Sequence, residues 1–241
     1  MNRKVSASKI IVALDLPDVD LALRVASDLR HSVQIVKIGP ELWMQGGKDF
    51  TARLVDIGFE IFLDLKFHDI PTTVYRACRA SAALGVSMLT VHALGGAAML
   101  QAALEGVQEG AKKRPPRVLG VTLLTSLNAD QLPLLGMDPS VDRLVKKLAQ
   151  SAWEAKLDGV VASAQEASAI RKTFGKRFLI VTPGIRLTRA ESQDQKRVAT
   201  PQEAFQAGAD YIVVGRPVIE AKRPQEVIKR IMDAALDSRK K

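Results

Sequence analysis

The chain has 241 residues, 47% of them hydrophobic and 25% charged, which is the balance of an ordinary globular protein with room for a sizeable core. Its single cysteine, Cys78, excludes an internal disulfide and a cysteine-based metal cluster, and it fits a reducing compartment. The formal charge of +9 raises the question of nucleic acid or another anionic partner. Much of the excess lies in two short runs, 112–114 and 239–241, and aromatic residues make up only 5% of the chain. We therefore expect no nucleic-acid partner, and the rest of the positive charge fits an anionic small-molecule substrate.

The first apolar run, Ile10–Leu14, ends at Asp15. It is too short for the apolar region of a signal peptide, and no later segment approaches the roughly 18 apolar residues of a membrane span. We expect a cytoplasmic protein with no membrane partner.

Eight short segments rich in apolar and β-branched residues recur at fairly even spacing. Their near-continuous hydrophobicity is typical of parallel strands that are buried on both faces. The predicted strands are Lys9–Asp15, Val33–Gly39, Glu60–Lys66, Met88–Ala93, Val118–Thr125, Gly159–Ser163, Phe178–Gly184 and Tyr211–Arg216.

Helical patterns lie between these strands. Leu21, Val25 and Leu29 follow the N-cap candidate Asp18 at a spacing of four, and residues 142–157 and 224–236 have similar patterns. Glycines at 58, 85, 159 and 208 precede strands, as expected where a helix ends and a strand begins. Eight such units predict an α/β fold, a (β/α)8 barrel, with residues 1–241 as a single domain. A doubly wound sheet is the alternative, but Leu14–Pro17 stands where its glycine-rich loop would be.

Charged residues gather where the first three strands end, and in such a barrel function lies at the C-terminal ends of the strands. Asp64 and Lys66 share one face of the third strand, Asp15 ends the first, and Lys37 lies near the end of the second. Buried charges are costly unless they are paired, so these residues predict a compact array of alternating charge. A salt bridge at a strand end is the alternative to a catalytic site. Asp69 follows closely, just before Pro71, which is placed to open a helix.

A long polar segment, residues 185–200, follows the seventh strand, and loops of that length are often functional. It contains Arg186 and Gln195, and Gly215 and Arg216 follow the eighth strand. Guanidinium groups and free backbone amides suit a phosphate dianion, and barrels often hold phosphate at these two strand ends. The sequence therefore predicts a phosphorylated small substrate.

Three further polar residues, His92, Thr125 and Ser163, end predicted strands. We interpret His92 as a hydrogen-bonded structural residue, and nothing in the sequence places the ring of His68. The carboxylates near the array are interleaved with lysines that would repel a cation, so we expect no metal.

The stretch Asp64–Thr73, with the sequence DLKFHDIPTT, resembles the motif of the orotidine 5′-phosphate decarboxylase family. Four further segments resemble the bacterial branch of that family, in order over nearly the whole chain: Val12–Asp15, Val36–Gly39, Pro183–Arg186 with Asp194–Gln195, and Val213–Pro217.

The resemblance implies the cofactor-free decarboxylation of orotidine 5′-phosphate to uridine 5′-phosphate, the last step of de novo UMP synthesis. Lys66 would protonate C6 as carbon dioxide leaves, and Asp64 would lie against the substrate carboxylate. Lys37 would belong to the charge array and, with Asp15, would contact the ribose hydroxyls.

The remaining implied roles concern the partner subunit, the base and the phosphate. Asp69 and Thr73 would reach into the neighbouring subunit's site, which makes the active unit a homodimer. Thr125 would bind the pyrimidine, with Ser126 as a neighbour of unassigned role. The phosphate would be held by Arg186, Gln195, Gly215 and Arg216.

Two alternative functions each fit part of the sequence. Sugar-phosphate enzymes such as 3-keto-L-gulonate 6-phosphate decarboxylase and hexulose-phosphate synthase share an Asp-x-Lys-x-x-Asp strand, but they resemble metal enzymes with an acidic residue where this chain has Lys37. A basic nucleic-acid-binding protein would fit the net charge, but it explains none of the charged strand ends.

Overall fold

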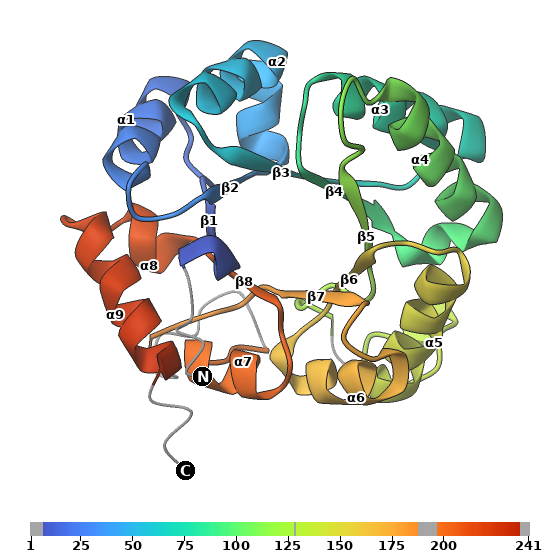
Figure 1. Ribbon diagram of the computed structural model, residues 1–241. Coiled ribbons are helices and arrows are strands. Elements are labelled where there is room, and N and C mark those ends of the chain that lie inside the picture. Colours follow the sequence, from blue (N-terminus) through green and yellow to red (C-terminus); the bar gives the residue numbers. More distant parts are fainter. Residues whose placement is uncertain (1–6, 128, 188–196, 237–241) are drawn as a thin grey trace.

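The computed structural model describes residues 7–127, 129–187 and 197–236, and its eight parallel strands form a closed barrel in sequence order (Figure 1). β1 pairs with both β2 and β8, which closes the barrel and confirms the predicted (β/α)8 fold. The strands are β1 (Ile10–Ala13), β2 (Ile35–Ile38), β3 (Glu60–Phe67), β4 (Met88–His92), β5 (Arg117–Val121), β6 (Gly159–Val161), β7 (Leu179–Thr182) and β8 (Tyr211–Val214).

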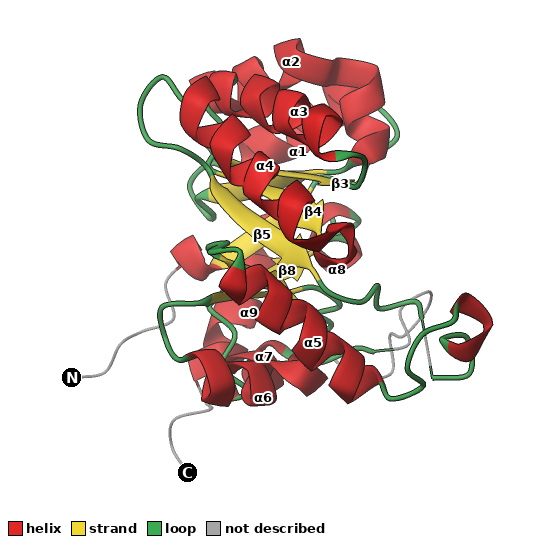
Figure 2. Cartoon of the chain, turned by 90° about the vertical axis from the view of Figure 1, so that its right-hand side faces the viewer, coloured by secondary structure: helices red, strands yellow, loops and turns green. Residues whose placement is uncertain are grey.

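Helices surround the barrel on its outside (Figures 1 and 2). They are α1 (Val19–Leu29), α2 (Pro40–Ile57), α3 (Pro71–Ala83), α4 (Gly96–Gly110), α5 (Val141–Glu154), α6 (Ala164–Phe174), α7 (Pro201–Gln206), α8 (Arg216–Ile219) and α9 (Pro224–Leu236), with short 3-10 helices at Ala7–Lys9, Ala93–Gly95 and Pro133–Leu135. Asp18 caps α1 by accepting from the Leu21 N–H at 2.7 Å, and Pro71 opens α3. Among the described helices, none combines the length and the hydrophobicity needed to cross a membrane.

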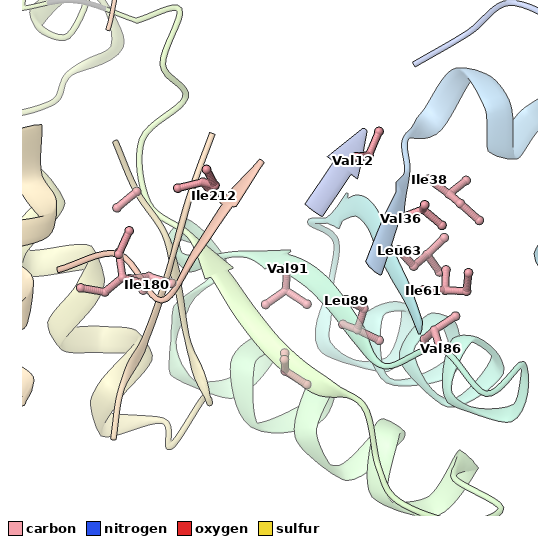
Figure 3. Close-up of a cluster of buried hydrophobic side chains, with 14 of the residues drawn as sticks. Val12, Val36, Ile38, Ile61, Leu63, Val86, Leu89, Val91, Ile180 and Ile212 are labelled. Carbon is pink, nitrogen blue, oxygen red and sulfur yellow. The ribbon is translucent and has the colours of Figure 1, made fainter. Parts of the chain in front are cut away.

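The two faces of each strand bury different groups of residues. Outward-facing side chains such as Val36, Leu63 and Ile212 belong to the large cluster shown in Figure 3, which also contains the buried faces of the helices. Inward-facing residues fill the barrel itself with a smaller apolar cluster: Ile11, Ala13, Ile35, Phe62, Met88, Leu119, Val181 and Val213. Each fully buried side chain of this kind contributes about 1.5–3 kcal/mol. The barrel is therefore solid below its C-terminal mouth, and polar side chains can gather only above this apolar floor.

Three of the four glycines predicted at helix-to-strand connections, Gly58, Gly85 and Gly208, adopt the positive φ angles that such turns need. Gly159 does not, because α5 ends earlier and Lys156 takes the left-handed position, with φ of 65°. Gly159 is instead the first residue of β6, where a Cβ atom would lie 2.2 Å from the carbonyl oxygen of Leu179. Its role is to allow the close approach of β7.

Seven of the eight predicted strands end earlier than expected, most of them by one or two residues and β5 by four. β5 stops at Val121, and the next residue, Thr122, still donates to the carbonyl of Val161 on β6 through both its backbone N–H (3.3 Å) and its hydroxyl (3.0 Å). Thr125 therefore lies in the loop after β5 and does not end the strand. β6 stops at Val161, and Ser163 caps α6.

Candidate active site

The C-terminal mouth of the barrel holds a cavity of about 580 Å³, a volume typical of small-molecule sites. Inward positions at the ends of the strands and the loops that follow them line it. Nine of the residues singled out from the sequence are among its lining residues: Asp15, Lys37, Asp64, Lys66, Thr125, Ser126, Arg186, Gly215 and Arg216.

Four of these residues form a continuous chain of opposite charges. The Nζ atom of Lys37 lies 2.9 Å from Oδ1 of Asp15 and 3.5 Å from Oδ2 of Asp64. The same Oδ2 atom accepts a hydrogen bond of 2.9 Å from Nζ of Lys66. Asp64 thus bridges the two lysines, and the predicted array is present within one chain.

Burial and pairing act in opposite directions on the array. Burial by itself would lower the pKa of Lys37, but Asp64 and Asp15 outweigh it and raise that pKa above its ordinary value. Burial would likewise raise the pKa of Asp64, but Lys37, Lys66 and the hydrogen bond from Thr90 hold it below its usual range. The arrangement therefore keeps Lys37 and Asp64 charged.

The backbone of β3 is irregular where it carries Lys66. Leu63 pairs with Leu89 and Phe67 with Val91, so β3 advances four residues while β4 advances two. Lys66 has a φ angle of 51°, which is unusual for a residue with a side chain, and its N–H donates to the hydroxyl of Thr90 at 2.9 Å. Strain of this kind is kept where the surroundings enforce it, often at functional sites. The inward direction of Asp64 and Lys66 agrees with simple alternation, but the bulge does not follow from it.

The part of the cavity wall that follows β7 and β8 contains two arginines. Arg186 is buried, with 7% of its surface exposed, and it lines the cavity together with Gly215 and Arg216. The backbone N–H of Arg186 donates to the carbonyl of Ala199 at 3.0 Å, and the backbone N–H of Ala199 donates to the carbonyl of Gly184 at 3.1 Å. This wall suits an anionic group. Gln195, predicted for the same wall, lies outside the described residues.

Asp69 and Thr73 do not line the cavity. Both are exposed in the single chain, as is the intervening Ile70, with 67% of its surface accessible. The Asp69 carboxylate accepts from the N–H of Ile70 at 2.6 Å. Their predicted place in a partner's site therefore stays a prediction.

The environment of His92 differs from the one expected from the sequence. Its ring lies 5.2 Å from that of the exposed His68, and among the described residues its buried Nδ1 atom has no hydrogen-bond partner. Burial, then His68 and Lys66, lower its pKa below the ordinary value. The structure therefore does not show the expected hydrogen bond at Nδ1.

No group of three or more acidic, histidine or cysteine side chains is placed to hold a metal in the part of the chain that the structure describes. The expectation that the site uses no metal stays a prediction.

Sequence reasoning missed two residues that shape the array. Thr90, fully buried on β4, donates to Oδ1 of Asp64 at 3.0 Å. Gly39 leaves room for the first ion pair, because a Cβ atom there would lie 3.1 Å from Oδ1 of Asp15 and 3.4 Å from Nζ of Lys37. Alternation along β4 could have indicated that Thr90 faces inward, but not that it faces Asp64.

Comparisons with known proteins agree with this geometry. Residues 8–231 match the model of the orotidine 5′-phosphate decarboxylase / HUMPS family. The orotidine 5′-phosphate decarboxylase of Hydrogenovibrio crunogenus is 46% identical over 232 residues, which cover 96% of this chain and 98% of that protein. The enzyme of the same name from Dichelobacter nodosus is 48% identical over 93% of this chain and 97% of its own length. The crystal structure of orotidine 5′-phosphate decarboxylase from Lactobacillus acidophilus superposes with a TM-score of 0.84 at 38% identity, covering 95% of this chain and 99% of that one.

Proposed function

Because this chain belongs to the orotidine 5′-phosphate decarboxylase / HUMPS family, we infer that it catalyses the decarboxylation of orotidine 5′-phosphate to uridine 5′-phosphate. The reaction belongs to pyrimidine biosynthesis, and the substrate is a small nucleotide. The observation that carries the assignment of residues is the array Asp15–Lys37–Asp64–Lys66, which lies in the same cavity as Arg186 and Arg216.

Lys66 is the proposed proton donor. Loss of carbon dioxide from C6 breaks a carbon–carbon bond and leaves its electron pair on the ring carbon, where no adjacent group can accept it. A fixed ammonium beside C6 stabilises that developing charge in a low-dielectric site and then transfers its proton to the carbon. Lys66 is held by Asp64 on one side and by its strained backbone on the other, so it needs little reorganisation during the reaction.

Asp64 is proposed to lie against the substrate carboxylate. Its hydrogen bonds from Lys66 and Thr90 and its ion pair with Lys37 keep a buried carboxylate ionised. Repulsion between the two carboxylates would act on the ground state and disappear as carbon dioxide leaves.

The other lining residues are proposed to bind the substrate away from C6. Asp15 and Lys37 contact the ribose hydroxyls, and Thr125 binds the pyrimidine. Arg186, Gln195, Gly215 and Arg216 hold the phosphate. Binding energy gained at the phosphate can then be used to lower the barrier at C6, beyond tightening the complex.

We also propose that the chain acts as a homodimer, with Asp69 and Thr73 completing the partner's site next to Lys66. The exposure of both residues, and of Ile70 between them, supports this. Mixing refolded Lys66→Ala and Asp69→Ala chains tests it, because each mixed dimer would contain one intact site. A recovery of about a quarter of the wild-type specific activity is expected from random pairing. Two inactive variants that stay inactive after mixing would contradict shared sites.

The central experiment follows absorbance during incubation with orotidine 5′-phosphate in a chelating buffer with no added cofactor. We propose a single-domain, cytoplasmic enzyme that needs no cofactor. Under these conditions the orotate spectrum should therefore convert to the uracil spectrum, with uridine 5′-phosphate as product. Activity that depends on added magnesium would contradict the cofactor-free reaction and favour the sugar-phosphate branch of the family.

A further inference from the structure

Arg197 joins two parts of the cavity wall that are far apart in the chain. Its Nη1 atom donates to Oε1 of Glu166 at 2.6 Å, and Nη2 donates to the backbone carbonyls of Leu124 at 2.8 Å and Leu123 at 3.4 Å. The side chains of the ion pair are only 9% and 4% exposed. Burying such a pair has a large desolvation cost, and the roles proposed above make no use of it.

On one side, Arg197 holds the base of the loop that follows β5. Leu123 and Leu124 precede Thr125 and Ser126, and all four residues line the cavity. The Leu124 carbonyl also accepts from the N–H of Leu127 at 3.0 Å, which closes a turn around Thr125 and Ser126. The guanidinium therefore positions the turn that carries the pyrimidine-binding residue.

Glu166 provides a rigid anchor for this contact. Its Oε2 atom accepts hydrogen bonds from both the backbone N–H (3.0 Å) and the hydroxyl of Ser163. These contacts form the capping box that starts α6. The carboxylate is thereby attached to the end of β6, next to Ala162 in the cavity wall.

On the other side, Arg197 is connected to the phosphate wall through the backbone. Arg197 lies two residues before Ala199, and Ala199 exchanges hydrogen bonds with the segment that carries Arg186, at 3.0 Å to the Arg186 N–H and 3.1 Å to the Gly184 carbonyl. A displacement of Arg186 would thus be transmitted through Ala199 to Arg197, and from there to Leu124.

We propose that Arg197 is a positioning residue that couples the binding of the substrate phosphate at Arg186 to the placement of Thr125 and Ser126 around the pyrimidine, with Glu166 as its anchor. This inference rests on the proposed function. It accounts for how binding energy at the phosphate, remote from C6, reaches the ring that reacts.

The test compares orotidine 5′-phosphate with orotidine, which lacks the phosphate, for wild type, Arg197→Met, Arg197→Lys and Glu166→Gln. For Arg197→Met, kcat/KM with the phosphorylated substrate is expected to fall about 30-fold or more, mostly in kcat, and with orotidine by less than about threefold. Arg197→Lys should lie between, because one ammonium cannot reach both the carboxylate and the carbonyls as a guanidinium does. Glu166→Gln keeps the volume of the side chain, and its kcat/KM should also fall more with orotidine 5′-phosphate than with orotidine, but by a smaller factor than that of Arg197→Met.

A matched control removes another partly buried arginine ion pair, that of Arg171 with Asp210. Arg171 also donates to the carbonyls of Phe178 before β7 and Gly208 before β8, at the opposite end of the barrel. Arg171→Met is expected to lower the melting temperature without changing the ratio of kcat/KM for orotidine 5′-phosphate to kcat/KM for orotidine. Equal losses on both substrates in the Arg197 and Glu166 variants would overturn the positioning role. Absence of decarboxylation by the wild-type protein would instead refute the proposed function. If Arg197→Met does not fold, Arg197→Lys and Glu166→Gln show whether kcat/KM falls selectively with orotidine 5′-phosphate or equally with both substrates.

Discussion

The hydroxyl of Thr90 lies 3.0 Å from Oδ1 of Asp64, and this contact joins β4 to β3 inside the barrel. The hydroxyl oxygen of Thr90 also accepts a hydrogen bond from the backbone N–H of Lys66, whose φ angle of 51° is otherwise unfavourable. One buried hydroxyl thus orients both the Asp64 carboxylate and the backbone of Lys66, two residues that line the cavity.

Thr90→Val should remove both contacts while keeping the volume of the side chain. An unsatisfied buried carboxylate oxygen costs about 1–3 kcal/mol, so the free energy of unfolding should fall by that amount. We expect kcat/KM to fall about 10–100-fold because Lys66 loses its orientation. Steady-state kinetics and urea unfolding measure the two effects.

Thr182→Val is the matched control for this substitution. Thr182 is fully buried on β7, and its hydroxyl has no hydrogen-bond partner among the described residues. The substitution should leave stability unchanged or slightly improved and should not change kcat/KM. Equal effects of the two Thr→Val changes would mean that the Thr90 contacts are unimportant.

Lys66→Ala should reduce turnover by about 10⁴-fold or more, since it removes the proposed proton donor and the positive charge proposed to lie beside C6. The Lys66 side chain is 32% exposed, so the protein should remain folded by circular dichroism. Lys48→Ala, at an exposed position on α2, should keep full activity. A variant at position 66 with substantial turnover would refute the role assigned to the lysine.

Protonation of His92 should destabilise the fold. Burial, His68 and Lys66 lower its pKa in the folded protein, while Asp64 acts in the opposite direction. The unfolded chain therefore binds the proton more readily, and stability should be lost as pH falls from about 6.5 through the folded pKa. His92→Gln should remove this part of the pH dependence in urea titrations at pH 5 to 8. His31→Gln, at an exposed position, should not.

Gly106→Ala should destabilise the protein although an alanine normally favours a helix over glycine. A Cβ atom at Gly106 would lie 2.3 Å from the backbone carbonyl oxygen of Tyr75, so α4 and α3 would have to separate. We expect the free energy of unfolding to fall by about 1–3 kcal/mol, as for other overpacked cores. Gln108→Ala, on the exposed side of α4, is the control. An increase in stability at Gly106 would show that the helices can move apart freely.

Cys78 should be unreactive toward thiol reagents in the folded protein. It is fully buried, and burial raises the pKa of its thiol to about 12, so almost no thiolate forms at neutral pH. Ellman's reagent should react at the rate of unfolding, and rapidly in denaturant. Rapid labelling under native conditions would contradict the burial of α3 against its neighbours.

Much of the fold was predictable because its signals are local. Strands buried on both faces are continuously apolar whichever neighbours they pair with, so the segment around Ile10–Leu14 could be recognised from itself alone. The caps at Asp18 and the proline at Pro71 are likewise local. The predicted ends of β1, β6, β7 and β8 were two residues too late and that of β5 four residues too late, because the apolar pattern continues past the last paired residue. At β6 the extra residue Ser163 caps α6.

The candidate site divides in the same way. The charge pattern of Asp64 and Lys66, together with the family resemblance, was sufficient to indicate the reaction and most of the polar and charged residues that line the cavity. The bulge in β3, the hydroxyl of Thr90 beneath Asp64 and the reach of Arg197 were not foreseeable, because each depends on a partner more than 20 residues away. By itself, the sequence determined the order of strands, the set of charged strand ends and the chemistry they can perform. Only the tertiary structure decided which charge meets which, because closing eight strands into one barrel sets their register through the packing of the whole chain.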